Sequence, residues 1–328
     1  MLKTLLIVLV LAACHADSDD PIDDVSYPPC TGAAEQCLDS FAVDGHAMPV
    51  YRNVALTAPN AAITQAVIVV HGSTRDANNF FYSVMTAAEQ DGVDGTTAVI
   101  APHFECGDDD PPAGQLAWTC SGDDWSHGYG DTTWNISSFA VMDALVQQLA
   151  DKSRFPNLTR IVVTGMSAGG QLAQRYAATT QLDPASGDAI SYVVLSPSSY
   201  VWLDATRPAS TAGCSGYDDY YYGLGNRTGY VAIPSAEQIV DDFVARDVAY
   251  LVGGEDTLAN AAGTDLDTSC GANAQGVDRV ARAQAFFATV QARGAAHSLT
   301  IVPGCMHSRD CMYYAPEVRA RVLGASEM

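Results

Sequence analysis

The sequence contains very little positive charge. Lysine occurs only at Lys3 and Lys152, and 16 lysine and arginine residues stand against 38 aspartate and glutamate residues, which gives a formal net charge of −22. Binding to nucleic acid needs clustered basic side chains that pair with phosphates, so we expect no nucleic-acid partner. The same acidity repels anionic membranes and polyanionic substrates. The composition therefore predicts a solvated, acidic surface.

Metal-binding patterns and repeats are also absent from the sequence. No C-x-x-C pair or His-rich spacing indicates zinc, and no internal repeat or coiled-coil heptad is present. Two acidic groups, at 108–110 and 123–124, have the chemistry of Ca²⁺ ligands. Their spacing matches no calcium loop, so a solvated acidic loop is the favoured interpretation. We therefore expect no metal and no organic cofactor.

The N-terminus has the pattern of an export signal. Lys3 precedes an apolar run at 5–13, which is too short to span a bilayer. The run ends in Leu-Ala-Ala-Cys, at Cys14, and resembles the bacterial lipoprotein box. This resemblance implies that residues 1–13 are removed as a signal peptide and that Cys14 carries acyl chains. An ordinary signal peptide that is cleaved nearby is the alternative.

Residues 14–29 are rich in Asp and Pro and are predicted to form a flexible tether before a single domain at 30–328. A chain of this kind would be exported and anchored to the outer face of the bacterial cell envelope, or secreted. The only membrane contact that we expect is the lipid anchor.

Eight cysteines remain when Cys14 is set aside. An even number of cysteines in an exported chain predicts disulfide bonds. The spacing does not determine their connectivity, but pairing of neighbours is the simplest arrangement. It would give the pairs Cys30–Cys37, Cys106–Cys120, Cys214–Cys270 and Cys305–Cys311.

Short apolar runs alternate with segments of helical periodicity. Continuous apolar runs of this length are typical of strands that are buried on both faces of a parallel sheet. The predicted strands lie at 67–70, 97–101, 161–164, 192–195, 248–252 and 299–302. The predicted helices lie at 78–90, 137–149, 168–178, 236–245, 277–293 and 317–323. The alternation predicts a doubly wound, mostly parallel α/β sheet, with antiparallel edge strands before residue 67, including 50–56.

Two long segments interrupt this alternation, at 105–131 and at about 196–235. Long insertions of this kind are often functional loops, and the second one is rich in aromatic residues, as a lid over a substrate would be. Trp125, Tyr200 and Trp202 are the candidate substrate contacts. Ordinary packing of the aromatic side chains onto the domain is an equally good interpretation.

The strongest chemical motif is G-M-S-A-G, centred on Ser167. It ends an apolar strand and opens a helix, and such a sharp turn presents the serine hydroxyl above the sheet edge. The helix N-terminus also directs its dipole at developing negative charge. We therefore predict that Ser167 is a nucleophile.

A serine nucleophile needs a base and an orienting acid. His307 follows the last predicted strand in P-G-C-M-H-S, and G-G-E-D-T follows the strand before it. Asp256 is favoured over Glu255 as the acid because a shorter side chain on the loop after the glycines resembles the usual arrangement of such an acid. A disulfide between Cys305 and Cys311 would clamp the histidine loop.

The oxyanion of the reaction needs backbone donors. The amide of Ala168, next to the nucleophile, is one candidate. The other should come from the loop H-G-S-T after the first core strand, where Ser73 is favoured and Thr74 is the alternative. His71 is expected to be structural because it lies at a strand end.

These pieces resemble the α/β-hydrolase superfamily from about residue 67 to the C-terminus. The order serine, acid, histidine is the order of that superfamily, and the closest likeness is to secreted esterases such as polyhydroxybutyrate depolymerases and feruloyl esterases. The resemblance implies hydrolysis of a small or polymeric ester through an acyl-enzyme. An amidase or peptidase with the same three residues is the first alternative, and a non-catalytic surface binding module is the second.

Overall fold

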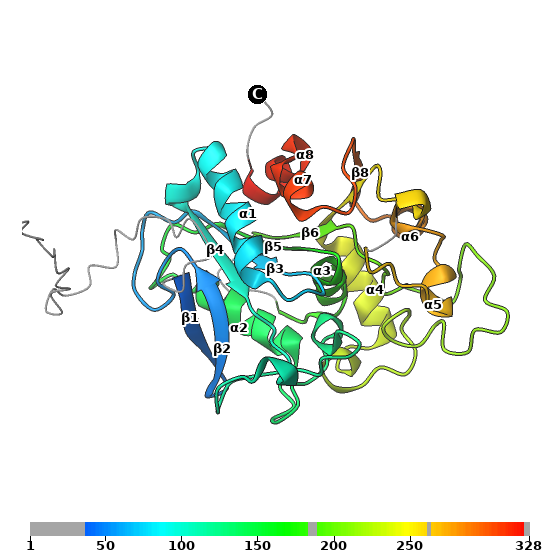
Figure 1. The fold of residues 1–328 in the computed structure, drawn as a ribbon, viewed down its shortest axis with the longest axis horizontal. Coiled ribbons are helices and arrows are strands. Elements are labelled where there is room, and N and C mark those ends of the chain that lie inside the picture. The colour runs from blue at the N-terminus through cyan, green and yellow to red at the C-terminus, as the bar shows by residue number, and fades with distance from the viewer. Residues whose placement is uncertain (1–36, 183–188, 261–263, 325–328) are drawn as a thin grey trace, which may run out of the picture.

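The computed structural model describes residues 37–182, 189–260 and 264–324. Within them, one eight-stranded sheet has the order β1-β2-β4-β3-β5-β6-β7-β8 (Figure 1). The strands from β4 to β8 in this order are parallel, and β1 and β2 are antiparallel additions at one edge. The predicted doubly wound, mostly parallel sheet is therefore confirmed. The strands are β1 Leu38–Val43, β2 His46–Arg52, β3 Gln65–Val70, β4 Thr97–Pro102, β5 Arg160–Met166, β6 Ala189–Leu195, β7 Asp247–Gly253 and β8 Ser298–Val302.

Helices connect the strands along the chain. The α-helices are α1 Ala77–Gln90, α2 Ser138–Ala150, α3 Ala168–Thr179, α4 Ala236–Ala245, α5 Cys270–Asn273, α6 Arg279–Ala292, α7 Arg309–Tyr314 and α8 Pro316–Leu323. Side chains cap several of them, because Ser137, Ser235, Asp278 and Ser308 each accept a hydrogen bond from an amide of the first turn.

The sheet is buried on both faces because its strands carry apolar residues at successive positions. In β3, Ile68 and Val70 face one apolar layer, and Val67 and Val69 face the other. The first layer is closed by α2, α3, α4 and α6, and the second by α1, α7 and α8. Figure 1 shows α1, α7 and α8 together on one side of the sheet. The carboxyl ends of the parallel strands therefore meet at one edge, between the two layers.

The antiparallel edge differs from its prediction. A tight turn at Asp44 and Gly45, with φ of 50° and 83°, connects β1 to β2, and β2 ends at Arg52. The expected edge strand at 50–56 is thus displaced toward the N-terminus. Both φ angles are positive, as in the two-residue turns that match the twist of a hairpin.

The aromatic insertion at 196–235 contains one 3₁₀ turn, Gly229–Ala232, and otherwise follows an irregular path. Many of its large side chains are buried against the first apolar layer. The cavity described below takes no lining residue from it, so its role as a lid stays a prediction.

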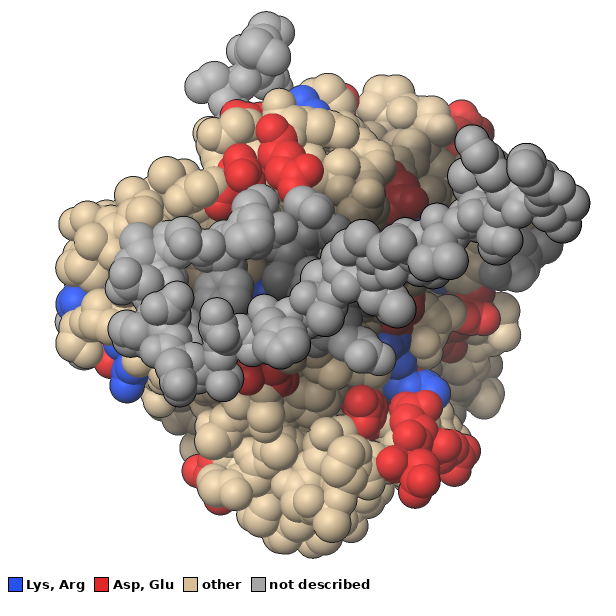
Figure 2. All heavy atoms as spheres, turned by 60° about the vertical axis from the view of Figure 1, so that its left-hand side comes forward, with Lys and Arg blue, Asp and Glu red and all other residues tan. Residues whose placement is uncertain are grey.

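The predicted signal peptide, tether and Cys14 lie outside the described residues, as does Cys30 of the expected Cys30–Cys37 pair. None of the helices in the described part of the chain combines the length and apolarity needed to cross a bilayer. On the face shown in Figure 2, acidic side chains gather in several groups and basic ones are few, which agrees with the net charge of −22.

Candidate active site

Ser167 occupies the sharp turn between β5 and α3. Its backbone has φ 61° and ψ −120°, a conformation that L-residues rarely adopt. Glycines permit the turn: a Cβ on Gly165 would lie 2.5 Å from the carbonyl oxygen of Gly169, and one on Gly169 would lie 2.2 Å from that of Val70. Only glycine fits at these two positions, so the motif is required by the close approach of strand and helix.

His307 and Asp256 lie on neighbouring loops, which follow β8 and β7. His307 Nδ1 is 2.7 Å from Asp256 Oδ2. Backbone hydrogen bonds tie the loops together, from the amide of Gly254 to Val302 O at 2.8 Å and from the amide of Glu255 to Cys305 O at 2.9 Å. The Glu255 side chain is exposed, whereas Asp256 is only 2% exposed. The geometry therefore pairs the histidine with Asp256 and not with Glu255.

Asp256 keeps its negative charge despite burial. Burial alone would raise the pKa of this carboxyl, but the His307 hydrogen bond and the Arg279 guanidinium outweigh it and lower the pKa below its usual value. Arg279 Nη1 lies 3.2 Å from Asp256 Oδ1. With Asp256 ionised, the Nδ1–H of His307 donates to Oδ2, and Nε2 is left to accept a proton.

A cavity of about 210 Å³ opens beside these residues. Ser167 and His307 both contribute to its wall, as do the loop after β3 and the segment after β7. Charged groups also line it: Asp265 is exposed, while Asp76 forms an ion pair of 2.8 Å with Arg309. The full lining is Gly72, Ser73, Thr74, Asp76, Phe80, Met166, Ser167, Thr264, Asp265, His307 and Arg309.

The candidate oxyanion loop follows β3 and is held by His71. This histidine is fully buried; its Nδ1 lies 2.8 Å from Gly72 O, and its Nε2 accepts the amide of Phe104 at 3.0 Å. Burial lowers the pKa of His71 to about 3, so the ring is neutral and can make both contacts. The expected structural role of His71 agrees with this geometry.

The predicted oxyanion donors are available. Gly72 approaches the nucleophile closely, because a Cβ at Gly72 would lie 3.8 Å from Ser167 Cβ. Within the described residues, the amides of Ser73 and Thr74 donate to no backbone acceptor, and Ala168 is the first residue of α3, where an amide has no partner inside the helix. Donors without a partner at the rim of a cavity suit an oxyanion that forms there.

Three disulfides have both cysteines among the described residues: Cys106–Cys120, Cys214–Cys270 and Cys305–Cys311. These are three of the pairs expected from pairing of neighbours. Cys305–Cys311 spans the loop of His307, and Cys106 donates its amide to Asp109, the ion-pair partner of Arg75. Each bridge therefore ties down a loop at the carboxyl edge of the sheet. Such bridges are typical of proteins in oxidising compartments.

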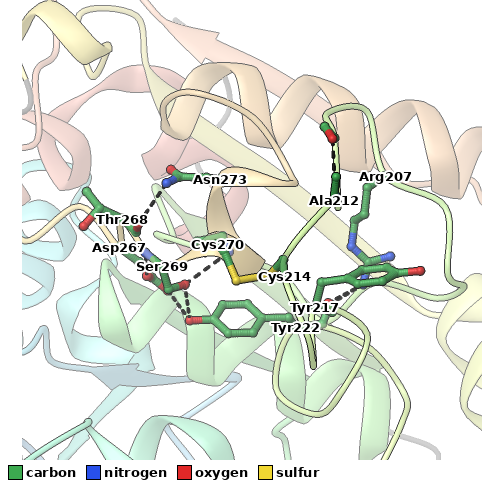
Figure 3. The surroundings of a disulfide bond; sticks show 12 residues. Arg207, Ala212, Cys214, Tyr217, Tyr222, Asp267, Thr268, Ser269, Cys270 and Asn273 are labelled. Carbon is green, nitrogen blue, oxygen red and sulfur yellow. Dashed lines mark hydrogen bonds between the residues drawn. A yellow bond between two sulfur atoms is a disulfide. The ribbon is translucent and has the colours of Figure 1, made fainter.

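Figure 3 shows the Cys214–Cys270 bridge, which joins the aromatic insertion to the segment before α6. Tyr222 of the insertion donates to Asp267 at 2.7 Å and accepts from Ser269 at 2.6 Å. This segment begins with the cavity residues 264 and 265, so the bridge anchors one wall of the site.

The three aromatic candidates for substrate contact do not lie in the cavity. Trp125, Tyr200 and Trp202 are all at most 1% exposed, and none lines it. Trp125 stacks on Phe104 and Tyr200 stacks on Phe286, as core side chains do. The structure thus favours packing, the other interpretation of these aromatic residues.

The acidic loop also gives no sign of a cation site. Among the described residues, no group of three or more His, Cys, Asp or Glu side chains is arranged to hold a metal ion. Asp109 instead pairs with Arg75 at 3.2 Å.

Sequence patterns missed three charged residues of the site: Asp265, Arg309 and Arg279. Arg309 lies two residues after His307, and that proximity was a usable signal. Asp265 lies in an irregular segment, and Arg279 opens a helix, where nothing in the pattern indicates burial.

No family model matches the sequence, and neither does any curated protein. Solved structures resemble the fold. Poly(aspartic acid) hydrolase-1 from Sphingomonas sp. KT-1 superposes with a TM-score of 0.60 at 21% identity, over 84% of this chain and 94% of that one. The poly(3-hydroxybutyrate) depolymerase LpqC from Bordetella parapertussis does so with a TM-score of 0.63 at 17% identity, over 89% and 92%. Together with the strand order and the serine turn, these neighbours show that the chain has the α/β-hydrolase fold.

Proposed function

We propose that the protein is a serine hydrolase that cleaves carboxylic esters outside the cytoplasm. One observation carries the proposal: Ser167 and His307 line the same cavity, and His307 is bonded through Nδ1 to the buried, ionised Asp256. Nucleophile, base and orienting acid are the parts that acyl transfer needs. The likeness to a poly(3-hydroxybutyrate) depolymerase in fold agrees with ester chemistry.

In the proposed reaction, Ser167 Oγ attacks the ester carbonyl and His307 Nε2 takes its proton. The C–O bond to the alcohol then breaks, and His307 returns the proton to the departing alkoxide. Water attacks the acyl-enzyme, again giving a proton to His307, and the acid leaves as Ser167 Oγ is reprotonated. Asp256 holds the imidazole in the required tautomer throughout.

The tetrahedral intermediates carry an oxyanion. The amides of Ser73 and Ala168 are the proposed donors, with that of Thr74 as the alternative to Ser73. Preorganised amides of this kind stabilise the negative charge without reorganising during the reaction. The buried His71, which bonds Gly72 O, would keep this loop in place.

The charges of the cavity favour an uncharged ester. Arg309 is the cation among the lining residues, and it is already bonded to Asp76 and Asp310, whereas Asp265 presents an exposed carboxylate. A carboxylate on the substrate would therefore be repelled. Of the two structural neighbours, the one named for a neutral polyester fits these charges better than the one named for poly(aspartic acid).

Labelling with a fluorophosphonate probe tests the proposal. The wild-type protein should be labelled and should hydrolyse 4-nitrophenyl butyrate, and Ser167→Ala should lose both. Matched ester and amide substrates then separate an esterase from an amidase. Labelling that persists in Ser167→Ala would refute the nucleophile, and turnover of the amide alone would refute the ester assignment. An unlabelled, inactive wild-type protein would favour a surface binding module.

Location and anchoring form a second part of the proposal. The three disulfides support an oxidising compartment outside the cytoplasm. We propose acylation of Cys14 after removal of residues 1–13, because of the Leu-Ala-Ala-Cys pattern. Mass spectrometry of the mature N-terminus should find a lipid on Cys14; an unmodified N-terminus created by cleavage elsewhere would exclude the anchor.

A further inference from the structure

Arg279 is a fully buried arginine, and it lies where helix physics disfavours it. It opens α6, at the positive end of that helix's dipole, and its side chain is 0% exposed. Burying a cation is costly unless it is paired and hydrogen-bonded. The hydrogen-bond partners of Arg279 therefore indicate the role of this buried charge.

The guanidinium holds the triad acid from the side opposite to the histidine. Asp256 uses Oδ2 for His307 at 2.7 Å and Oδ1 for Arg279 Nη1 at 3.2 Å. With both oxygens engaged, the carboxylate has little freedom to rotate away from the imidazole.

The same guanidinium holds the wall of the cavity. Its Nη1 donates to Thr264 Oγ1 at 3.0 Å, and its Nη2 donates to the carbonyl oxygen of Thr264 and to Ser198 Oγ. Ser198 Oγ in turn donates to the carbonyl oxygen of Asp265 at 3.1 Å. Two successive carbonyl groups of the wall are thus fixed from the Arg279 side.

Asp265 extends this network to the oxyanion loop. Its Oδ2 accepts the hydroxyl of Ser73 at 2.9 Å, and Ser73 supplies the favoured second oxyanion amide. A continuous path of short contacts therefore runs from Asp256 through Arg279, the 264–265 wall and the Asp265 carboxylate to Ser73.

We propose that Arg279 is a positioning residue that couples the triad acid to the oxyanion loop through Asp265. It aligns both parts of the catalytic apparatus with one guanidinium and touches neither the cavity nor the reacting atoms. This inference rests on the proposed function, because it needs Ser167 to be a nucleophile.

The same helix provides a matched control. Arg282, one turn further along α6, is also fully buried, but its partners are the carbonyl oxygens of Gly276 and Ser198 and the side chain of Asn273. Arg279→Lys and Arg282→Lys each remove one buried guanidinium fork and keep the charge, so their costs in stability should be similar. Only the first change should alter catalysis.

The experiment measures the rate of fluorophosphonate labelling and the turnover of 4-nitrophenyl butyrate as functions of pH, together with Tm. Arg279→Lys should lower the labelling rate and kcat by about 10- to 100-fold with a smaller change in KM, because Arg279 itself does not line the cavity. Arg282→Lys should leave kcat close to that of the wild type. Arg279→Met, which also removes the charge, should shift the acid limb of the pH profile to higher pH, and Arg279→Lys should restore it. The titratable and charged groups that face Asp256 and Arg279 are His307, Asp265, Tyr200 and Arg282.

Asp265 variants test the coupling itself and do not depend on tolerance of a change at Arg279 inside the core. Asp265→Ala removes the acceptor of Ser73 and should lower kcat by about tenfold, whereas Asp265→Asn keeps an acceptor and should retain most of the activity. Combined with Arg279→Lys, Asp265→Ala should cost less than the product of the two single losses, because both act on one path.

Equal losses of kcat in the two lysine variants, or independent effects in the double variant, would overturn the coupling. A wild-type pH profile in Arg279→Met would do so as well. These results are distinct from failure of the proposed function, in which the wild-type protein itself would be neither labelled nor active.

Discussion

The interior of the sheet and its carboxyl edge are held together in different ways. Strand β4 is buried along its whole length, β5 and β7 are buried beyond their first residue, and their contacts are almost entirely apolar. The edge carries the three described disulfides and the ion pairs of Arg75, Arg279 and Arg309. Apolar burial supports the fold without fixing any loop, whereas directional bonds fix the loops that carry the proposed catalytic residues. Stability and activity should therefore respond to different changes.

The largest contrast should come from one substitution in each region. His307→Gln should lower ester hydrolysis by about a million-fold, as loss of a triad base does, with little change in the free energy of unfolding. Leu145→Ala, in the buried face of α2, should cost about 3 kcal/mol of stability and leave turnover per folded molecule intact. Turnover and chemical denaturation of both variants check this. Comparable activity losses in the two would mean that edge and interior are not separable.

Two disulfides sharpen the contrast. Loop length predicts that one bridge contributes more to stability, whereas position near His307 predicts that the other contributes more to kcat. Removing Cys214–Cys270, which closes a separation of 56 residues, should cost about 4 kcal/mol by the chain-entropy model. Removing Cys305–Cys311, with a separation of 6, should cost about 2 kcal/mol. The second change releases the loop of His307, so it should lower kcat about tenfold, more than the first. Double Cys→Ser variants of each pair test this when the free energy of unfolding and kcat are both measured. The variant with the smaller loss of stability should have the larger loss of kcat.

Acid should destabilise the protein through its buried histidines. His71 has a pKa of about 3 in the folded state and about 6.5 when unfolded. The unfolded chain therefore binds more protons between these values, and stability is complete above pH 6.5 and falls as pH decreases toward 3. At pH 4.5 this histidine alone should lower the free energy of unfolding by about 3 kcal/mol relative to neutral pH. The free energy of unfolding should be measured for the wild type and His71→Gln at pH 7.5 and 4.5, and it should fall less in the variant. Equal decreases would mean that protonation of another group causes the loss of stability.

The smallest expected effect concerns the charge of Asp265. Asp265→Asn should raise the relative kcat/KM for an anionic ester, 4-nitrophenyl hydrogen glutarate, over neutral 4-nitrophenyl butyrate by about fivefold. Salt should reduce this gain because the carboxylate is exposed. If the ratio of kcat/KM for the anionic ester to that for the neutral ester is the same in Asp265→Asn and the wild type at low salt, the acyl group binds away from Asp265.

Predictability from sequence follows the same division. Ser167, Asp256 and His307 each follow an apolar run, and parallel strands place their carboxyl ends at one edge, so local patterns were enough to bring the three together. The helices were also predicted from a local pattern, because apolar residues at helical spacing indicate a helix with one buried face.

The remaining parts depend on tertiary contacts that no local pattern encodes. Arg279 has the spacing of an ordinary helix residue, and only the approach of the loop after β7 makes it a partner of Asp256. The aromatic residues Tyr200 and Trp202 were ambiguous because composition does not say which way a ring faces. The β1–β2 hairpin did leave a signal, Asp44 before Gly45, which is a typical turn pair.

The disulfides beside the loops of the proposed active site have a consequence for how the protein matures. Before oxidation, the cysteines of the three described bridges would be six free thiols, all outside the sheet. A newly made chain could thus complete its sheet in a reducing environment, and, under the proposed export, its loops would acquire the geometry of the site only where the bridges form. Preparations from reducing and oxidising hosts should then have similar circular dichroism but different turnover, and activity would report on oxidative folding.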